Sequence, residues 1–185
     1  MEESDSELEE AARQLDVFRD TPIRLLGYAN EVGEAFRSLV RVRWVHFSYL
    51  VASSYVVSDT LDKSHRCYKK HKAFHPELRR TKVTMAAIDT LIWQSFASVI
   101  VPGFTINRLC ALSAWILKRK AGRMPSNVRK WTTTAIGLAA IPFIVKPIDW
   151  SVHRVMDISC RPYYMAEITN IHDPDITEHH RAYLD

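Results

Sequence analysis

The sequence is poor in glycine and cysteine and carries no signature of a catalytic or nucleotide-binding site. Its 185 residues include five glycines and three cysteines. Cys67, Cys110 and Cys160 are widely spaced and form no C-x-x-C pair, so the sequence predicts neither a disulfide framework nor a zinc ribbon. Walker A, G-x-S-x-G, G-x-G-x-x-G, H-E-x-x-H and EF-hand patterns are also missing. We therefore expect a protein that is not an enzyme and needs no metal or cofactor.

The N-terminal segment lacks the features of a cleavable targeting signal. Residues 1–18 are acidic, without the apolar core of a secretory signal and without the Arg-rich character of a mitochondrial presequence. Any organelle address is then expected within the chain. Residues 163–185 form a polar C-terminal tail, which leaves residues 19–162 for a single domain. Because strand-like alternation is also scarce, this domain is predicted to be all-α.

Charged and apolar residues are separated into blocks along the chain. Hydrophobic residues make up 47% of the sequence and charged residues 25%, with a net charge of +4. The basic residues gather at the ends of the apolar blocks, a pattern that suits anionic lipid headgroups better than a nucleic-acid groove. We therefore expect lipid contacts and no nucleic-acid partner.

The central stretch 83–107 is the longest segment with almost no charge, and Asp89 is its only ionisable residue. A transmembrane helix needs roughly 20 mostly apolar residues, which residues 83–101 supply before the Pro102-Gly103 pair. That pair predicts a bend or a helix end. A buried helix of a soluble bundle would be similarly apolar, so hydropathy alone leaves both interpretations open.

Two more apolar blocks, at residues 44–58 and 131–145, lie between charged residues. With the central block at 83–101 they predict about three membrane-embedded helices, which would place the ends of the chain on opposite sides. The basic connector 63–82 is expected to be exposed. Its histidines have spacings that a metal could use, but the surrounding lysines and arginines oppose cation binding.

Residues 21–41 show the clearest amphipathic pattern and are predicted to form one helix that starts at Thr21 and Pro22. Its apolar face could lie in a membrane interface or pack on the other helices, and we favour packing. The opposite face is polar and carries Asn30, Glu31, Glu34, Arg37, Ser38 and Arg41. We predict that the apolar face makes helix or partner contacts through Leu25, Val32 and Phe36.

A second predicted contact surface lies on the central block, where Asp89 and Trp93 share a seam of small and polar residues. A carboxylate at membrane depth is costly and needs a partner, for which Arg108, Gln94 or a polar residue on another apolar block are candidates. Asp89 could make a helix-packing contact or line a proton or solute pathway. Basic residues beside the blocks are expected to anchor the helices at headgroup level: Arg37, Arg41, Arg43, Arg108, Lys130 and Lys146.

Four stretches, taken together, resemble a known family. They are RDTPIRLLGYANEVGEAFRSLV, VASSYVVSDTLDK, DTLIWQSFASVIVPGFTINR and VRKWTTTAIGLAAIPFIVKPIDWSVHRVMD. In this order and with similar spacing they resemble the mitochondrial fission process protein family over most of the chain from Arg19 to about Asp157. The longer basic, His-rich connector and the C-terminal extension depart from the family pattern.

This resemblance implies a multi-pass protein of the mitochondrial inner membrane that promotes or regulates mitochondrial fission without a catalytic centre. We expect a scaffold or regulator that contacts inner-membrane lipids and other inner-membrane or division-machinery proteins, and that could form a homo-oligomer. The alternative is a transporter, a channel or a modulator of ion or proton leak, in which Asp89, Gln94 and Arg108 would line a pathway.

Overall fold

Helices make up every regular element that the computed structural model describes, which covers residues 18, 22–72, 76–120 and 123–163. This part of the chain contains no strand, as the sequence predicts. The two expected tails, except for Phe18 and Tyr163, lie outside the described residues. The elements are the 3-10 helices η1 (Pro22–Tyr28) and η2 (Phe36–Ser38), the π-helical turn η3 (Ser95–Ile100), and the α-helices α3 (Ala29–Ala35), α4 (Val42–Lys70), α5 (Pro76–Gln94), α6 (Val101–Lys120) and α7 (Ser126–Ile158).

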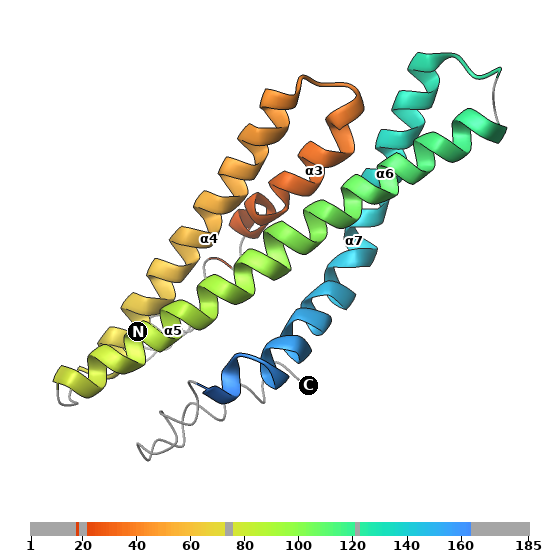
Figure 1. The fold of residues 1–185 in the computed structure, drawn as a ribbon. Helices are drawn as coiled ribbons and strands as arrows, with labels where there is room; N and C mark the ends of the chain where they lie inside the picture. The colour runs from red at the N-terminus through yellow and green to blue at the C-terminus, as the bar shows by residue number, and fades with distance from the viewer. Residues whose placement is uncertain (1–17, 19–21, 73–75, 121–122, 164–185) are drawn as a thin grey trace, which may run out of the picture.

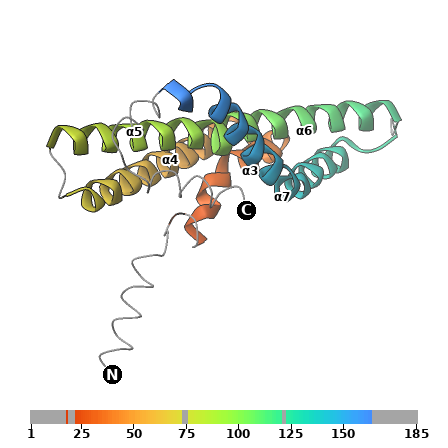
Figure 2. The same cartoon turned by 90° about the horizontal axis from the view of Figure 1, so that it is seen from below.

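The centre of the fold is one long rod made of α5, η3 and α6, which Figure 2 shows as a nearly straight helix. The expected break at Pro102-Gly103 is therefore wrong. Pro102 has no N–H to donate to the carbonyl four residues earlier, and the preceding turn is π-helical, with the Val101 N–H bonded to Phe96 O. A π-helical turn widens the helix locally, so the chain passes the proline without ending the rod.

The other helices pack on different halves of the rod (Figure 1). α4 lies along α5, while the first half of α7 lies along α6. The short segment η1–α3–η2 fills the space between α4 and α7 and contacts the middle of the rod. The expected single helix over residues 21–41 is thus replaced by three short helical pieces, and α3 reaches α4, α6 and α7 at once.

The connection between α4 and the rod is shorter than the sequence suggests. α4 extends through much of the basic connector to Lys70, and the rod begins at Pro76. The connector is only partly exposed, because His71 and Lys82 are buried. α7 likewise continues through both internal prolines, Pro142 and Pro147, to Ile158.

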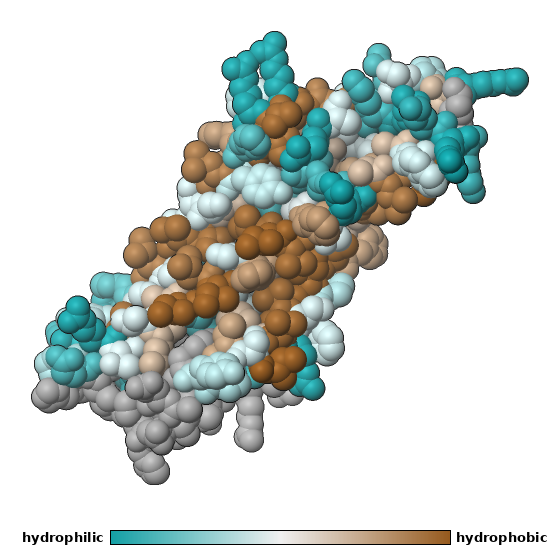
Figure 3. Space-filling view, in the orientation of Figure 1, coloured by the Kyte–Doolittle hydropathy of each residue, from teal (hydrophilic) through white to brown (hydrophobic). Residues whose placement is uncertain are grey.

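The outer surface is strongly apolar over the middle of the molecule. Figure 3 shows a hydrophobic band across the helices, with hydrophilic residues gathered at the ends. Two helical segments are long and apolar enough to cross a membrane, Arg79–Lys120 and Ser126–Tyr163. α4, which holds the block at 44–58, does not meet the same test, so a third span stays a prediction. Exposed large apolar side chains include Leu50, Val57, Phe104, Leu112, Phe143 and Ile158.

Candidate functional site

The polar face of the N-terminal segment points into the protein. Asn30 and Glu31 are completely buried and Glu34 is 2% exposed, whereas Leu25 is 67% and Val32 40% exposed. The expectation that the apolar face packs on the other helices is therefore wrong for Leu25 and Val32, while Phe36 is half-buried. The buried polar side chains of the segment are Asn30, Glu31 and Glu34, whereas Arg37 is exposed, and Ala35 of the apolar face is buried while Leu25 and Val32 are exposed.

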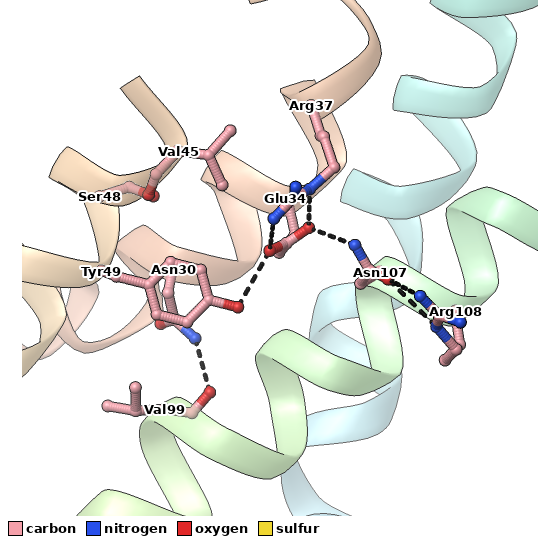
Figure 4. A network of polar contacts seen from close by, with 9 residues as sticks. All are labelled: Asn30, Glu34, Arg37, Val45, Ser48, Tyr49, Val99, Asn107 and Arg108. Atoms are coloured by element: carbon pink, nitrogen blue, oxygen red, sulfur yellow. Dashed lines mark hydrogen bonds and ion pairs between the residues drawn. The ribbon is translucent and has the colours of Figure 1, made fainter. Parts of the chain in front are cut away.

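Glu34 is the centre of a buried polar cluster that joins three elements (Figure 4). The Arg37 guanidinium donates to both carboxylate oxygens, each at 2.6 Å. Tyr49 Oη of α4 donates to Glu34 Oε1 at 3.0 Å, and Asn107 Nδ2 of α6 donates to Oε2 at 2.8 Å. Arg108 donates to Asn107 Oδ1 and thereby orients this amide. The cluster fixes α3 against both α4 and α6.

The two buried glutamates of α3, which lie outside both candidate spans, differ in their partners and in their pKa. Burial raises the pKa of Glu34, but hydrogen bonds from Arg37, Asn107 and Tyr49 outweigh it, so the pKa lies below its ordinary value. Glu31 has no side-chain partner for either carboxylate oxygen among the described residues. Burial raises the pKa of Glu31 to about 8. Glu34 is therefore ionised at neutral pH, and Glu31 is mostly protonated.

Glycine residues allow the helices around this cluster to approach closely. A Cβ at Gly103 would lie 2.5 Å from Tyr49 Oη, and one at Gly33 would lie 1.9 Å from Ser48 Oγ. A Cβ at Gly137 of α7 would lie 2.7 Å from Cys110 Sγ. Small residues at helix contacts are typical of packing inside membranes. Nearby, Asn30 Nδ2 donates to Val99 O in the π-helical turn at 3.0 Å, which adds a polar contact to the same junction.

A second polar cluster joins the rod to the end of α7. Arg161 donates to both carboxylate oxygens of Asp89 at 2.9 and 3.1 Å, and to Asp157 Oδ1 at 2.6 Å. This two-bond fork is a strong geometry for an arginine and a carboxylate. Asp89 thus bonds to Arg161, which is 5% exposed and lies after the three apolar blocks, and neither Arg108 nor Gln94 is the partner found here.

Gln94 forms its hydrogen bond with a different acid, Asp59. Its Nε2 donates to Asp59 Oδ2 of α4 at 2.5 Å, and Lys63 Nζ lies 3.0 Å from the same oxygen. Trp93, one residue earlier, stacks on His153 of α7 with ring centroids 4.9 Å apart. Asp89 and Trp93 therefore contact α7 within the same chain, while Gln94 contacts α4.

A cavity of about 370 Å³ lies between η1, α4, the rod and the second half of α7. Aromatic side chains form part of its wall, among them Trp93 and Trp150. Five basic and four acidic residues also line it: Arg24, Lys63, Lys146, Arg154, Arg161, Asp59, Asp89, Asp149 and Asp157. Such a charged cavity beside long apolar helices could hold a polar or ionic group.

The expected membrane anchors lie at several places on the surface. Arg41 and Arg43 are exposed at the start of α4, and Lys130 is exposed near the start of α7. Lys146 is exposed at the charged cavity. Arg37 and Arg108 are exposed too, but both also take part in the Glu34 cluster.

Sequence reasoning misses most residues of the two clusters. The amphipathic pattern places Glu34 on the polar face of the predicted helix but gives it no partner, and Arg161 lies beyond the stretches that carry the family resemblance. A signal for the first is present, because Gly27, Asn30, Glu31 and Glu34 recur at helical spacing. Such a seam of small and polar residues is the pattern that identifies Asp89 and Trp93. In the two clusters, hydrogen bonds connect Glu34 and Asp89 to side chains of neighbouring helical segments.

The chain is similar to known proteins of one family. Residues 10–156 match the model of the mitochondrial 18 kDa protein family (MTP18). A mitochondrial fission process protein 1 from Caenorhabditis elegans is 54% identical over 80% of this chain and 89% of its own length. The proteins of that name from Danio rerio and Homo sapiens are 53% and 52% identical, over 83% and 86% of this chain and 91% and 94% of their own lengths. No solved structure matches the chain.

The strings GYANEVGEAFRS and PGFTINR, on which the resemblance depends, meet in the Glu34 cluster. The first contributes Glu34 and Arg37, and the second contributes Gly103 and Asn107. With a family model covering most of the chain and relatives above 50% identity, this protein belongs to the mitochondrial 18 kDa protein family, whose similar members are named mitochondrial fission process protein 1.

Proposed function

We propose that this protein is a non-enzymatic, multi-pass protein of the mitochondrial inner membrane that promotes or regulates mitochondrial fission as a scaffold. The observation that carries the proposal is the exposed apolar surface of its long helices. Only 28% and 11% of the most apolar windows of the two candidate spans are buried inside the molecule. The core helix of a soluble protein would be mostly buried, and exposed apolar area of this extent calls for lipid or a partner protein.

The names of the relatives indicate the biological process that we propose for this protein. The proteins from Caenorhabditis elegans, Danio rerio and Homo sapiens are named for mitochondrial fission. At more than half identity over most of both chains, a shared process and organelle are the simplest inference for this chain. The inner membrane, rather than the outer one, follows from the family resemblance and is the finer part of the proposal.

A scaffold fits the interior better than a pathway does. The charges of Glu34 and Asp89 are matched by Arg37 and Arg161. Matched, hydrogen-bonded charges hold helices in one arrangement, whereas a conducting pathway needs groups that exchange partners. The apolar side chains of Leu25 and Val32 remain exposed and offer a contact surface for lipid or for a division protein.

Membrane insertion and topology are tested by alkaline carbonate extraction and by protease protection of N- and C-terminally tagged protein in mitochondria and mitoplasts. We expect carbonate resistance and protection of both tags in intact mitochondria, and in mitoplasts a tag that faces the intermembrane space should lose its protection while a tag in the matrix should keep it. Release by carbonate would refute the membrane proposal. Tags on the same side would mean two spans, in agreement with the two candidate helices, and tags on opposite sides would add the block at 44–58.

The scaffold role is tested by re-expression in cells that lack the endogenous protein, with mitochondrial length as the readout. Leu25→Ser combined with Val32→Ser changes only exposed side chains, so it should leave abundance unchanged but reduce fission. Leu112→Ser, at a 53% exposed position of α6, is the matched control and should retain activity. Full activity of the double variant at normal abundance would remove this face from the proposal.

The charged cavity favours a second candidate function, a transporter, a channel or a modulator of ion or proton leak. Its wall carries Asp89, Lys146 and Asp149 beside a candidate span, and ionisable residues at membrane depth often mark a pathway. Reconstitution into liposomes discriminates between the two functions. A pathway predicts a solute or proton flux that Asp89→Asn changes, whereas a scaffold predicts no flux from either protein.

A further inference from the structure

Two of the five basic side chains at the charged cavity have no acidic partner. Lys63 pairs with Asp59, Arg161 pairs with Asp89 and Asp157, and Arg24 lies 4.0 Å from Asp149. These pairs account for all four acids that line the cavity. Lys146 and Arg154 form no hydrogen bond or ion pair with the described part of the chain, and both are exposed. The cavity wall on α7 therefore carries two cations without an ion-pair partner in the described residues, and its nine Lys, Arg and Asp residues carry one net positive charge.

These two cations belong to one stripe on α7. Lys146, Trp150 and Arg154 follow each other at intervals of four residues, so their side chains leave the same side of the helix over about 12 Å. Trp150, which lies between the cations, is 65% exposed and lines the cavity. Phe143, one turn before Lys146, is 78% exposed. The stripe thus runs from an apolar residue to a cation, an aromatic ring and a second cation.

We propose that this stripe and the adjoining cavity bind the headgroup of an acidic phospholipid. Lys146 and Arg154 would hold the phosphate from the two sides of Trp150, a residue type that is enriched at the membrane interface. Phe143 would contact the acyl chain. Arg24 lies across the cavity, where it pairs with Asp149 at 4.0 Å.

Lipid is the occupant that the surroundings favour. The stripe lies on a candidate span whose most apolar window is only 11% buried, so the bilayer is what covers this face. This step rests on the proposed membrane embedding. An unfilled donor supports a polar ligand in the cavity, because Trp93 Nε1 is buried without a partner in the described residues and Trp93 lines the wall.

The test compares lipid retention by full-length protein in nanodiscs of phosphatidylcholine with and without phosphatidylglycerol, with native mass spectrometry as the readout. The parent should retain phosphatidylglycerol preferentially. Lys146→Gln combined with Arg154→Gln should weaken that retention roughly tenfold or more. Arg129→Gln combined with Lys130→Gln removes the same charge from the start of the same helix and should have little effect. Equal losses in both double variants, or none in either, would overturn the proposal.

Two further arms identify the source of the phosphate and the place of binding. Inorganic phosphate should not displace phosphatidylglycerol at millimolar concentration, and displacement would mean a free-phosphate site instead of a lipid site. Brominated phosphatidylglycerol should quench tryptophan fluorescence, and Trp150→Phe should remove part of this quenching. Unchanged quenching would contradict the stripe. Normal entry of all variants into phosphatidylcholine nanodiscs separates a failure of headgroup binding from a failure of membrane embedding, which would refute both proposals.

Discussion

Gly103 is the position at which one added methyl group most directly tests how α4 packs on the rod. A Cβ added there would lie 2.5 Å from Tyr49 Oη and 3.2 Å from Tyr49 Cζ. The ring cannot move away without breaking the 3.0 Å hydrogen bond from Tyr49 Oη to Glu34 Oε1. Overpacking of this kind costs about 1–3 kcal/mol. Alanine regains about 1 kcal/mol over glycine inside a helix, so the expected net loss of Gly103→Ala is up to about 2 kcal/mol.

A second substitution shows whether the loss comes from this contact. Tyr49→Phe alone should cost about 1.5–3 kcal/mol, because it removes a hydrogen bond to a charged acceptor. It also removes the atom that the new methyl group would meet first. The double variant should therefore be more stable than the sum of the single losses by about 1 kcal/mol.

The assay is thermal unfolding of the purified protein in detergent, followed by far-ultraviolet circular dichroism. Ala111→Val is the control, because it enlarges an exposed residue on the same helix. Its midpoint should match that of the parent. A higher midpoint for Gly103→Ala would mean that helix propensity dominates, and strictly additive losses in the double variant would refute the proposed contact.

Three further changes probe the polar interior. Burial raises the pKa of Glu31 from 4.5 to about 8 in the folded state, so the folded state loses stability as the pH rises through that window. Glu31→Gln should therefore raise the unfolding midpoint at pH values near 8 and have little effect near 4.5. Asp89→Asn should cost about 3 kcal/mol by leaving Arg161 buried with only one acid, and Arg161→Gln in the same chain should add less than its own separate loss. Gly137→Ala should lower the midpoint through the Cys110 contact, and Cys110→Ala should relieve that loss.

The helical fold and its long apolar segments could be predicted from composition, because low glycine content and uninterrupted apolar blocks depend only on local sequence. The rod was harder to predict. A proline inside a helix usually ends or kinks it. At Pro102 the preceding π-helical turn, Ser95–Ile100, lets the helix continue. A turn of that kind depends on contacts with α3, including the bond from Asn30 to Val99 O, which no local pattern reveals.

The orientation of residues 22–38 is the reverse of the one predicted from the sequence, for a physical reason. In water an apolar stripe turns inward, because burial removes it from solvent. Beside lipid the apolar stripe gains nothing by packing on protein, so the polar stripe turns inward to find hydrogen-bond partners. The periodicity of the sequence identifies an apolar and a polar face, but it does not say whether water or lipid surrounds the helix. Glu34 and Leu25 could therefore be assigned to sides only after deciding between water and lipid.

Polar contacts at two positions along the rod explain how helices with a small apolar core are held in one packing arrangement. Asn107 of the rod bonds to Glu34, and Gln94 of the rod bonds to Asp59. Thirteen residues of helix separate these positions, which is about 20 Å along the axis. A slide of the rod by one turn, about 5.4 Å, would break both contacts and leave two buried carboxylates with fewer donors. In the proposed membrane-embedded state, lipid exerts no hydrophobic force that favours one register over another, so these two contacts would select the register of the rod.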